Sequence, residues 1–467
     1  MAGTRLTQTS FARGELAPAL YNRVEIEQYS IGCKQIKNGF IHQEGCVSNR
    51  SGFEFIGEAK NSNDETRVFP FQFNSEQTYM IEAGDKYFRF IQDGGYIVDD
   101  DNNIVEIETP YKKEDLFQLK FVQSADILTI THVDYTPMEL ARYAHDDWRL
   151  TAIQVKPVIQ APVNLAIKWT GETSSNTKEY SYIVTAVEKE TLEESERSQV
   201  ITGKGHREAY WTTSEYFTLT WDEIEGAAEY NVYRSVNGIY GYIGTAERTS
   251  FIDDNIEPDL KSAAPISQNP FEDDNNPSCA TYFQQRKVYA CSYNNPQTFW
   301  ASQTATSNNF NISRPLIASD AITQALGDRE VNEIRHLIGL NHLIALTSNT
   351  EYRINGSDGV FEANPAPVAL VQSNYGSSHV QPIISGNMII FIQSGGSVMR
   401  DLGYDYLTDS YDGSELSLFA SHLFEGKFVK DMAYAKEPYR IIHVIFNDGT
   451  CACLLYTSPS PRDMRRS

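Results

Sequence analysis

The stretch RVFPFQFNSEQTYMIEAGDKYFRFIQDGGYIVDDDNNIVEIETP (67–110) decides the fold class. Its runs of β-branched and aromatic residues are short, and Asp, Asn or Gly separates each run from the next. Such runs favour strands, and the residues between them favour tight turns. Strands at this regular spacing are typical of a meander that closes into a barrel, a sandwich or a propeller. We therefore expect an all-β protein.

The same pattern resumes in the C-terminal half of the chain. Examples are KVYACSY (287–293), HLIGLNHLIALTS (336–348) and RIIHVIFNDGT (440–450), several of them paired across turns that contain Asn or Gly. Such pairing is typical of propeller blades. We expect one interrupted β-propeller-like body, formed by residues 1–160 and 278–452 around an inserted module.

Residues 161–260, which separate the two parts of the body, have a pattern of their own. The residues that define it are Trp221, Tyr230, Val232, Tyr233, Arg234, Tyr242, Ile243, Gly244, Phe251 and Asp253. The pattern resembles a fibronectin type III module, which implies a small β-sandwich with Trp221 and Tyr233 as core anchors between its two sheets. The acidic run 188–196 is expected to be a solvated loop. Residues 261–277, rich in Pro, Ser, Asn and Asp, are expected to be a linker.

The composition disfavours several classes of function. The chain has 39 Lys and Arg against 62 Asp and Glu, a formal net charge of −23. Nucleic acids and anionic membranes are polyanions, so a general binder of either is disfavoured. No apolar run approaches the roughly 20 residues that cross a bilayer, and the N-terminus does not resemble a secretory signal. The six cysteines are too sparse for a disulfide framework and fit a reducing cytoplasm.

The sequence carries no signal for catalysis, and we expect neither an enzyme nor a bound cofactor or metal. It has no HExxH, no GxSxG and no phosphate-binding loop motif. The acidic run 99–103 is dense in oxygen ligands, but Ile104 stands where a calcium loop needs Gly and Pro110 where it needs Glu. A hairpin turn is expected there. The nine histidines are scattered, and acidic residues are too common to single out a catalytic pair.

Residues 453–463, CLLYTSPSPRD, fit one reading frame of a transposase mosaic end followed by a sequencing-library adapter. We interpret residues 453–467 as a translated adapter and exclude them from the fold. The alternative is a Pro- and Ser-rich tail with a basic end. On the adapter interpretation the gene continues past Ala452, and the propeller is truncated with an unpaired sheet edge.

Four separated segments resemble one protein family. They are residues 10–60, 132–150, 295–302 and 373–450. In this order they resemble the tail nozzle proteins (tail tubular protein B-like) of short-tailed bacteriophages, although Ser51 stands where many members have Pro. The matched motif positions are Gly14, Pro18, Arg23, Tyr29, Asn38, Gly45, Arg50, Gly52, Trp148, Trp300, Arg400 and Asp409.

These motif positions are expected to do structural work. Gly45 and Gly52 suit turns with positive φ. The two tryptophans are expected to anchor the core, with a subunit interface as the alternative. Four charged residues are expected either in an ion-pair network or in solvated turns: Arg400, Asp401, Asp405 and Asp409.

The resemblance implies a structural virion protein. In the family, six copies form a ring, the tail nozzle, beneath the tail tube adaptor protein, and the genome leaves through its channel. The implied partners are further copies in a homo-hexamer, the adaptor, tail fibres or spikes, and genomic DNA that passes without specific binding. No stable membrane insertion is expected. The implied location is the virion tail, after synthesis in the host bacterial cytoplasm. An acidic lumen would let DNA slide without sticking.

A host-surface binding protein is the alternative function. The module at 161–260 would then bind a glycan or a receptor through aromatic side chains that can stack on sugars: Tyr180, Tyr182, Trp211, Tyr230, Tyr233 and Tyr240. In a small sandwich most such side chains fill the core. A depolymerase on a propeller would rest on fold analogy alone, which is weak support for a function.

Overall fold

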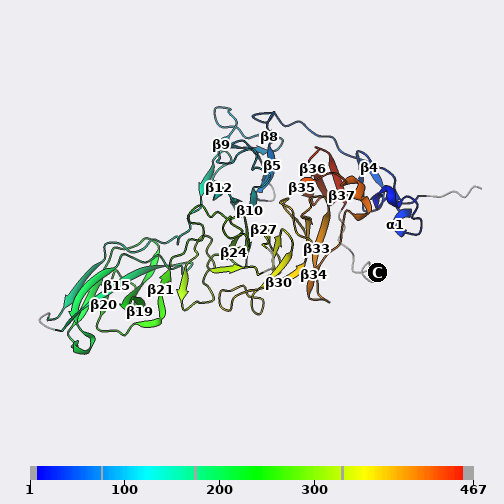
Figure 1. The fold of residues 1–467 in the computed structure, drawn as a ribbon. Coiled ribbons are helices and arrows are strands. Elements are labelled where there is room, and N and C mark those ends of the chain that lie inside the picture. The colour runs from blue at the N-terminus through cyan, green and yellow to red at the C-terminus, as the bar shows by residue number, and fades with distance from the viewer. Residues whose placement is uncertain (1–7, 75–76, 173–175, 328–330, 456–467) are drawn as a thin grey trace, which may run out of the picture.

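The computed structural model describes residues 8–74, 77–172, 176–327 and 331–455. The regular secondary structure of this part of the chain is almost entirely strand, with one α-helix and three short 3-10 helices. Small sheets form a ring, and a β-sandwich projects from the ring at one side (Figure 1). The predicted all-β, interrupted propeller-like architecture is confirmed.

The body consists of six antiparallel sheets that follow one another along the chain. The first contains β5 (Arg67–Gln72), β6 (Thr78–Gly84), β7 (Tyr87–Gln92), β8 (Gly95–Tyr96) and β9 (Glu106–Glu108). The second contains β10 (Lys120–Ser124), β11 (Ile127–His132), β12 (Tyr135–Arg142) and β13 (Trp148–Ala152). The third contains β22 (Cys279–Phe283), β23 (Arg286–Ala290), β24 (Thr298–Ala301) and β26 (Ile322–Ala325).

The other three sheets follow in the same way. The fourth contains β27 (Ile334–Gly339), β28 (Leu343–Thr347), β29 (Glu351–Asn355) and β30 (Val368–Ser373). The fifth contains β31 (Ile383–Ser385), β32 (Met388–Ile392), β33 (Met399–Asp405) and β34 (Ser410–Asp412). The sixth contains β35 (Val429–Ala435), β36 (Ile441–Phe446) and β37 (Cys451–Leu455).

Strand β5 shows why the quoted stretch forms strands. Arg67, Phe69 and Phe71 are buried, whereas Val68, Pro70 and Gln72, which alternate with them, are exposed. Successive side chains of a strand point to opposite faces, so alternation of this kind buries one face of the sheet and leaves the other in solvent.

The six sheets form a closed ring. First strands of neighbouring sheets contact one another, since β10 contacts β22, β22 contacts β27, and β31 contacts β35. The ring closes where Arg67 of β5 pairs with Asp431 of β35 at 3.2 Å. The ring is therefore closed within the described part of the chain. What the sequence beyond Ala452 would add stays a prediction.

Apolar clusters fill the spaces between sheets. Phe90 of the first sheet stacks on Trp148 of the second, with ring centroids 4.2 Å apart. Leu346 of the fourth sheet and Phe391 of the fifth belong to one buried cluster. The sheets thus pack face to face, as blades do in a propeller.

The sandwich is inserted between β13 and β22. One sheet contains β14 (Ala166–Thr170), β17 (Tyr216–Thr220) and β20 (Ser250–Asp253). The other contains β16 (Ile201–His206), β15 (Thr177–Glu188), β18 (Ala227–Val236), β19 (Ile239–Ala246), β21 (Asp259–Ile266) and β25 (Ile312–Arg314). The two-sheet arrangement agrees with the prediction, and kinship with fibronectin type III modules stays a prediction.

Only one of the two predicted core anchors lies between the sheets. Trp221 is buried in the cluster that the two sheets enclose. Tyr233 is also buried, but with Ile183 and Ala264 in a separate cluster. Tyr230 and Val232, on either side of Tyr233 in β18, face the enclosed core, so Tyr233 points to the opposite face.

The predicted linker at 261–277 is wrong for its first residues. Residues up to Ile266 belong to β21, which pairs with β19 on one side and with β25 of the body on the other. Ala264 is fully buried there. Ala264 packs with Ile183 and Tyr233 where β21 extends the sheet beside β19, and this burial outweighs the turn-forming composition of the segment.

The N-terminal residues 8–50, which we call the N-terminal arm, belong to none of the six sheets. Their elements are β1 (Gly14–Glu15), η1 (Pro18–Leu20), α1 (Glu27–Ser30), β2 (Gly32–Cys33), β3 (Gly39–Ile41) and β4 (Val47–Asn49). The remaining short helices are η2 (Glu208–Tyr210) and η3 (Leu418–Leu423). None of the helices in the described ranges is long and apolar enough to cross a membrane. Of the predicted adapter, residues 453–455 belong to β37 and 456–467 lie outside the described residues.

Candidate functional site

The N-terminal arm docks on the last part of the chain (Figure 1). The backbone N–H of Ala17 donates to the carbonyl of Phe419 at 2.7 Å. Glu15 lies 2.9 Å from the Nε2 atom of His422. The ring of Phe40 meets His443 of β36 edge-on, with centroids 6.3 Å apart. The beginning of the chain is thereby fixed to elements more than 400 residues away.

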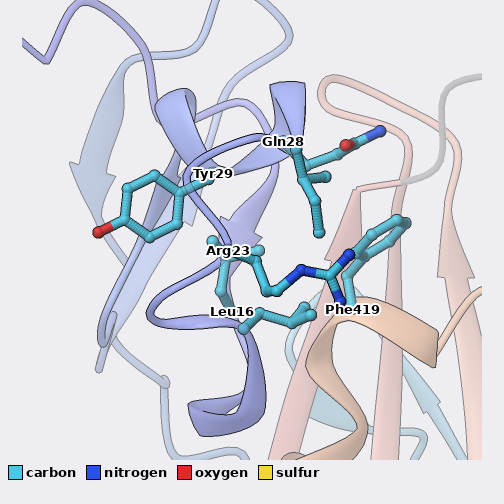
Figure 2. Close-up of a pocket in the computed structure, with 7 residues that line it drawn as sticks. Leu16, Arg23, Gln28, Tyr29 and Phe419 are labelled. Atoms are coloured by element: carbon cyan, nitrogen blue, oxygen red, sulfur yellow. The ribbon is translucent and has the colours of Figure 1, made fainter.

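The docked arm forms a shallow hollow (Figure 2). Its lining consists of Leu16, Leu20, Arg23, Ile26, Gln28, Tyr29 and Phe419. The side chain of Arg23 extends toward Phe419, whereas the ring of Tyr29 points away from it (Figure 2). Arg23 also forms an ion pair with Glu25. Most of the lining is apolar, so the hollow suits packing contacts better than chemistry.

Electrostatics around the arm are modest. Backbone hydrogen bonding and the Arg23 guanidinium lower the pKa of the exposed Glu25 carboxyl. Burial, followed by the charge of Glu15, raises the pKa of the Cys33 thiol. A raised pKa keeps this thiol protonated at neutral pH, so Cys33 is not an activated nucleophile.

The motif positions of the arm shape its turns. Gly14 and Gly45 have φ of +70° and +86°, and a Cβ on Gly45 would come within 1.9 Å of the Ser10 hydroxyl oxygen. The positive φ expected at Gly45 is confirmed. The same expectation for Gly52 is wrong, because Gly52 is not among the glycines with positive φ. The chain passes Gly52 in an extended run after β4 rather than in a turn.

Three further motif positions have local roles. Pro18 is the first residue of η1, where its fixed φ suits a helix start. The carbonyl of Asn38 accepts a 2.8 Å hydrogen bond from the backbone N–H of Arg50, which closes the β3–β4 hairpin. The Arg50 guanidinium lies 4.2 Å from the centroid of the Phe53 ring.

Both motif tryptophans are core residues. Trp148 is 4% exposed, and its indole N–H donates to the His145 carbonyl at 3.1 Å. Trp300 is 3% exposed and packs in a cluster with Tyr289 and Phe310. The core interpretation is confirmed for both.

The charged motif residues do not pair with one another. The Arg400 guanidinium stacks on the Tyr375 ring, 3.6 Å from its centroid. Asp409 pairs instead with Arg353 of β29 at 2.9 Å. Asp401 accepts hydrogen bonds from the backbone and side chain of Ser414. No ion pair joins these residues to one another in the described ranges, because Arg400 and Asp401 point to opposite faces of β33. Asp409 lies exposed in the turn after β33, as the alternative of solvated turns predicts.

The motif positions before residue 53 thus lie in or directly after the arm. The four later ones are spread over different sheets of the body, the second, third and fifth, and do not form one site. Sequence reasoning missed Phe419 and His422, the residues on which the arm docks. Both residues lie in the matched segment 373–450, within an apolar run at 416–424. No local pattern could connect that run with the N-terminus.

The aromatic set proposed for glycan stacking is largely unavailable. Tyr180, Tyr182, Tyr230 and Tyr233 are each at most 4% exposed. Trp211 packs against the sandwich core and is only half-buried. These side chains fill the sandwich, so they give the host-binding alternative little support.

Two groups of side chains hold their donor atoms within 4.8 Å of one another, close enough for a shared metal ion. They are His42, Glu44 and Cys46, and His443, Cys451 and Cys453. Both groups lie at the surface, and Cys453 belongs to the stretch interpreted as an adapter. Neither group is backed by a further structural feature.

A polar cluster lies where the first strands of four sheets begin. Lys120 opens β10 and donates to the Ser278 hydroxyl at 2.9 Å. The Nε2–H of His336 donates to the Ser378 carbonyl at 2.9 Å. Burial, and then the Lys120 charge, holds the pKa of His336 well below its usual 6.5. His336 is therefore neutral in the folded protein at physiological pH.

We expect the protein to lose stability as pH falls below about 6.5. Unfolded His336 takes up a proton there, whereas folded His336, facing Lys120, Arg335 and His379, does not. The unfolded state then binds more protons, so acid favours unfolding. The measurement is the Tm between about pH 7.5 and pH 5. His336→Gln should reduce the change of Tm with pH, whereas His145→Gln, a change at an exposed histidine, should not. An equal change of Tm with pH in the unchanged protein and in both variants would show that His336 is not the group responsible.

Comparisons with known proteins give no family. No family model and no curated protein matches the chain. Among solved structures, YCF48 from Cyanidioschyzon merolae is 9% identical with a TM-score of 0.33, covering 83% of this chain and 95% of that one. The BBS1N chain in complex with ARL6DN is 10% identical with a TM-score of 0.31, covering 84% and 92%. The computationally designed Ika8 protein is 10% identical with a TM-score of 0.27, covering 82% and 95%. Likeness at this level carries no argument about function.

Proposed function

We propose that this chain is a structural protein of a short-tailed phage that assembles with copies of itself into the hexameric tail nozzle. The observation that supports the proposal best is the N-terminal arm. The segment with the most motif positions forms a separate docking element outside the sheets of the body. An arm that ties distant parts together suits an assembly protein better than a single-copy enzyme.

Described residues from opposite sheets meet across the ring of a single copy. The Gln381 side chain, just before β31, donates to the carbonyl of Phe121 in β10 at 3.3 Å. These residues belong to the fifth and second sheets, which lie opposite each other in a ring of six. Side chains therefore cross the axis, and a DNA channel would have to lie between copies. The net charge of −23 would keep DNA from adhering to such a channel.

The proposal is tested by the oligomeric state of the full chain. We expect native mass spectrometry and negative-stain microscopy to find rings of six copies, alone or after addition of the tube adaptor protein. DNA should show no saturable binding to the rings at physiological salt. A protein that stays monomeric at all concentrations and with the adaptor would refute the proposal.

Phe53 and Phe55 are expected to lie in the contact between copies. Both follow the arm and are 91% and 78% exposed in a single copy. Exposed aromatic pairs of this kind mark interaction surfaces. Phe53→Ser with Phe55→Ser should reduce ring formation at least about tenfold, since about 1.4 kcal/mol per copy already changes an association constant tenfold. Val158→Ser, which changes an 86% exposed apolar residue elsewhere, is the matched control. Unchanged assembly with normal Tm would contradict the prediction.

A further inference from the structure

Lys120 is an exception among the buried cations of this protein. Lys287 pairs with Glu139 at 2.7 Å, Arg234 with Asp253 at 2.8 Å, and Arg67 with Asp431 at 3.2 Å. Arg286 donates to the carbonyls of Ser302, Ala318 and Asp320. Lys120, 6% exposed, donates only to the Ser278 hydroxyl, and no carboxylate of the described ranges lies within 4.0 Å of its Nζ atom.

This exception is costly unless a further group is present. A buried ammonium without a counter-charge loses its hydration and recovers little of it from one neutral hydroxyl. An ammonium has three N–H donors, so two donors of Lys120 have no acceptor among the described residues. The missing partner must be an acceptor, and a negatively charged one would also balance the charge.

A second cation, Arg335, whose charge acts with that of Lys120 on His336 and His379, is also incompletely satisfied. One terminal nitrogen of Arg335 donates to the Ser377 carbonyl at 2.8 Å, but its buried Nε atom has no hydrogen-bond partner. Glu333 lies 3.6 Å from that Nε, beyond hydrogen-bonding distance. The two cations thus outnumber the single carboxylate beside them.

His379 connects the two cations with the solvent. Its ring is exposed. Burial of part of the ring, then Lys120 and then Arg335, lower its pKa to about 4. Both positive charges therefore act on one exposed imidazole, and Ser377 and Ser378 beside it supply polar backbone.

We propose that this end of the ring axis, between Lys120 and Arg335, binds a small oxyanion, a phosphate or a carboxylate. The ammonium would supply a point charge and two free donors, and the guanidinium Nε a third. His379 would stand at the entrance. The oxyanion would bridge the second and fourth sheets, so it would also strengthen the ring. This site is independent of the proposed role in assembly.

The test is calorimetric titration of the full chain with inorganic phosphate and, separately, with acetate at matched ionic strength. We expect saturable one-to-one binding of at least one anion and a rise in Tm with its concentration. Saturation by phosphate alone or by acetate alone identifies the preferred chemistry. No saturable binding of either anion would overturn the proposal.

Variants test the two cations. Lys120→Met, which keeps the length of the side chain, should weaken binding at least about tenfold, as expected for loss of a charge-assisted hydrogen bond. Arg335→Gln should do the same, and it carries the test if Lys120→Met fails to fold. Lys168→Met, on an exposed strand of the sandwich, is the matched control. Binding that is unchanged in Arg335→Gln, or equally weakened in Lys168→Met, would overturn the proposal.

Discussion

Replacing Asp253 by alanine is expected to destabilise the sandwich by about 3–5 kcal/mol. Asp253 is fully buried in β20 and accepts hydrogen bonds from Arg234 of β18 and from the Tyr182 hydroxyl of β15, both at 2.8 Å. Its second oxygen accepts from the backbone N–H groups of Asn255 and Ile256. Without the carboxylate, Arg234 would keep a buried charge that nothing balances.

This expectation is measured by urea unfolding, followed through tryptophan fluorescence. Trp169, Trp211 and Trp221 lie in the sandwich and the other two tryptophans in the body, so the fluorescence reports both transitions and Asp253→Ala should shift that of the sandwich. Asp253→Asn keeps most hydrogen bonds and should cost less than Asp253→Ala. The exposed neighbour Asp254 gives the control, since Asp254→Ala should change stability by no more than about 0.5 kcal/mol. Equal effects of Asp253→Ala and Asp254→Ala would show that the buried pair does not hold the two sheets together.

Local patterns in the sequence predicted strands such as β5, in which burial alternates from one residue to the next. The alternation of Phe69 and Phe71 with exposed neighbours is visible in the sequence and is the same in β5. The inserted sandwich was predictable for the same reason, since Trp221 and its neighbours form local strands and turns. The fold class depends on residue patterns within short segments, and these patterns can be seen in a single sequence.

Relations between distant segments were not predictable. Arg67 and Asp431 close the ring across 364 positions, and nothing in either segment indicates the other. Tyr233 was assigned to the enclosed core because of its residue type, but a step of one position in β18 turns it to the other face. The linker boundary failed similarly, since β21 is a strand only because β19 and β25 flank it.

The candidate sites show the same limit. The arm and the segment 373–450 were both found through the resemblance, yet nothing in either segment indicated that Ala17 would meet Phe419. The cluster around Lys120 draws Ser278, Arg335 and His379 from separate segments. From the sequence alone, a lysine at the start of a strand is expected to be exposed to solvent. Only the ring shows that it is buried and lacks a counter-charge.

Replacing Trp148 by alanine is expected to cost about 3–5 kcal/mol in the body of the protein. Its ring stacks on Phe90 and meets Phe71 and Tyr79 edge-on, with centroids 4.9 and 5.2 Å away. These contacts join the first and second sheets, so alanine would leave a cavity between two blades. Trp148→Phe, which fills part of that cavity, should cost less.

The same experiment separates the two roles considered for Trp148. A core anchor is needed within each copy, so Trp148→Ala should lower the unfolding midpoint at every protein concentration. If Trp148 were instead an anchor between subunits, its removal would lower the midpoint only at concentrations at which the unchanged protein assembles. The effect would then depend on protein concentration. Tyr143→Ala, which removes a 66% exposed ring from the same sheet region, should change stability by no more than about 1 kcal/mol. A loss of stability that depends on protein concentration would contradict the core role and assign Trp148 to a subunit interface. The same loss at every concentration identifies the packing between the first two blades as a main source of the ring's stability.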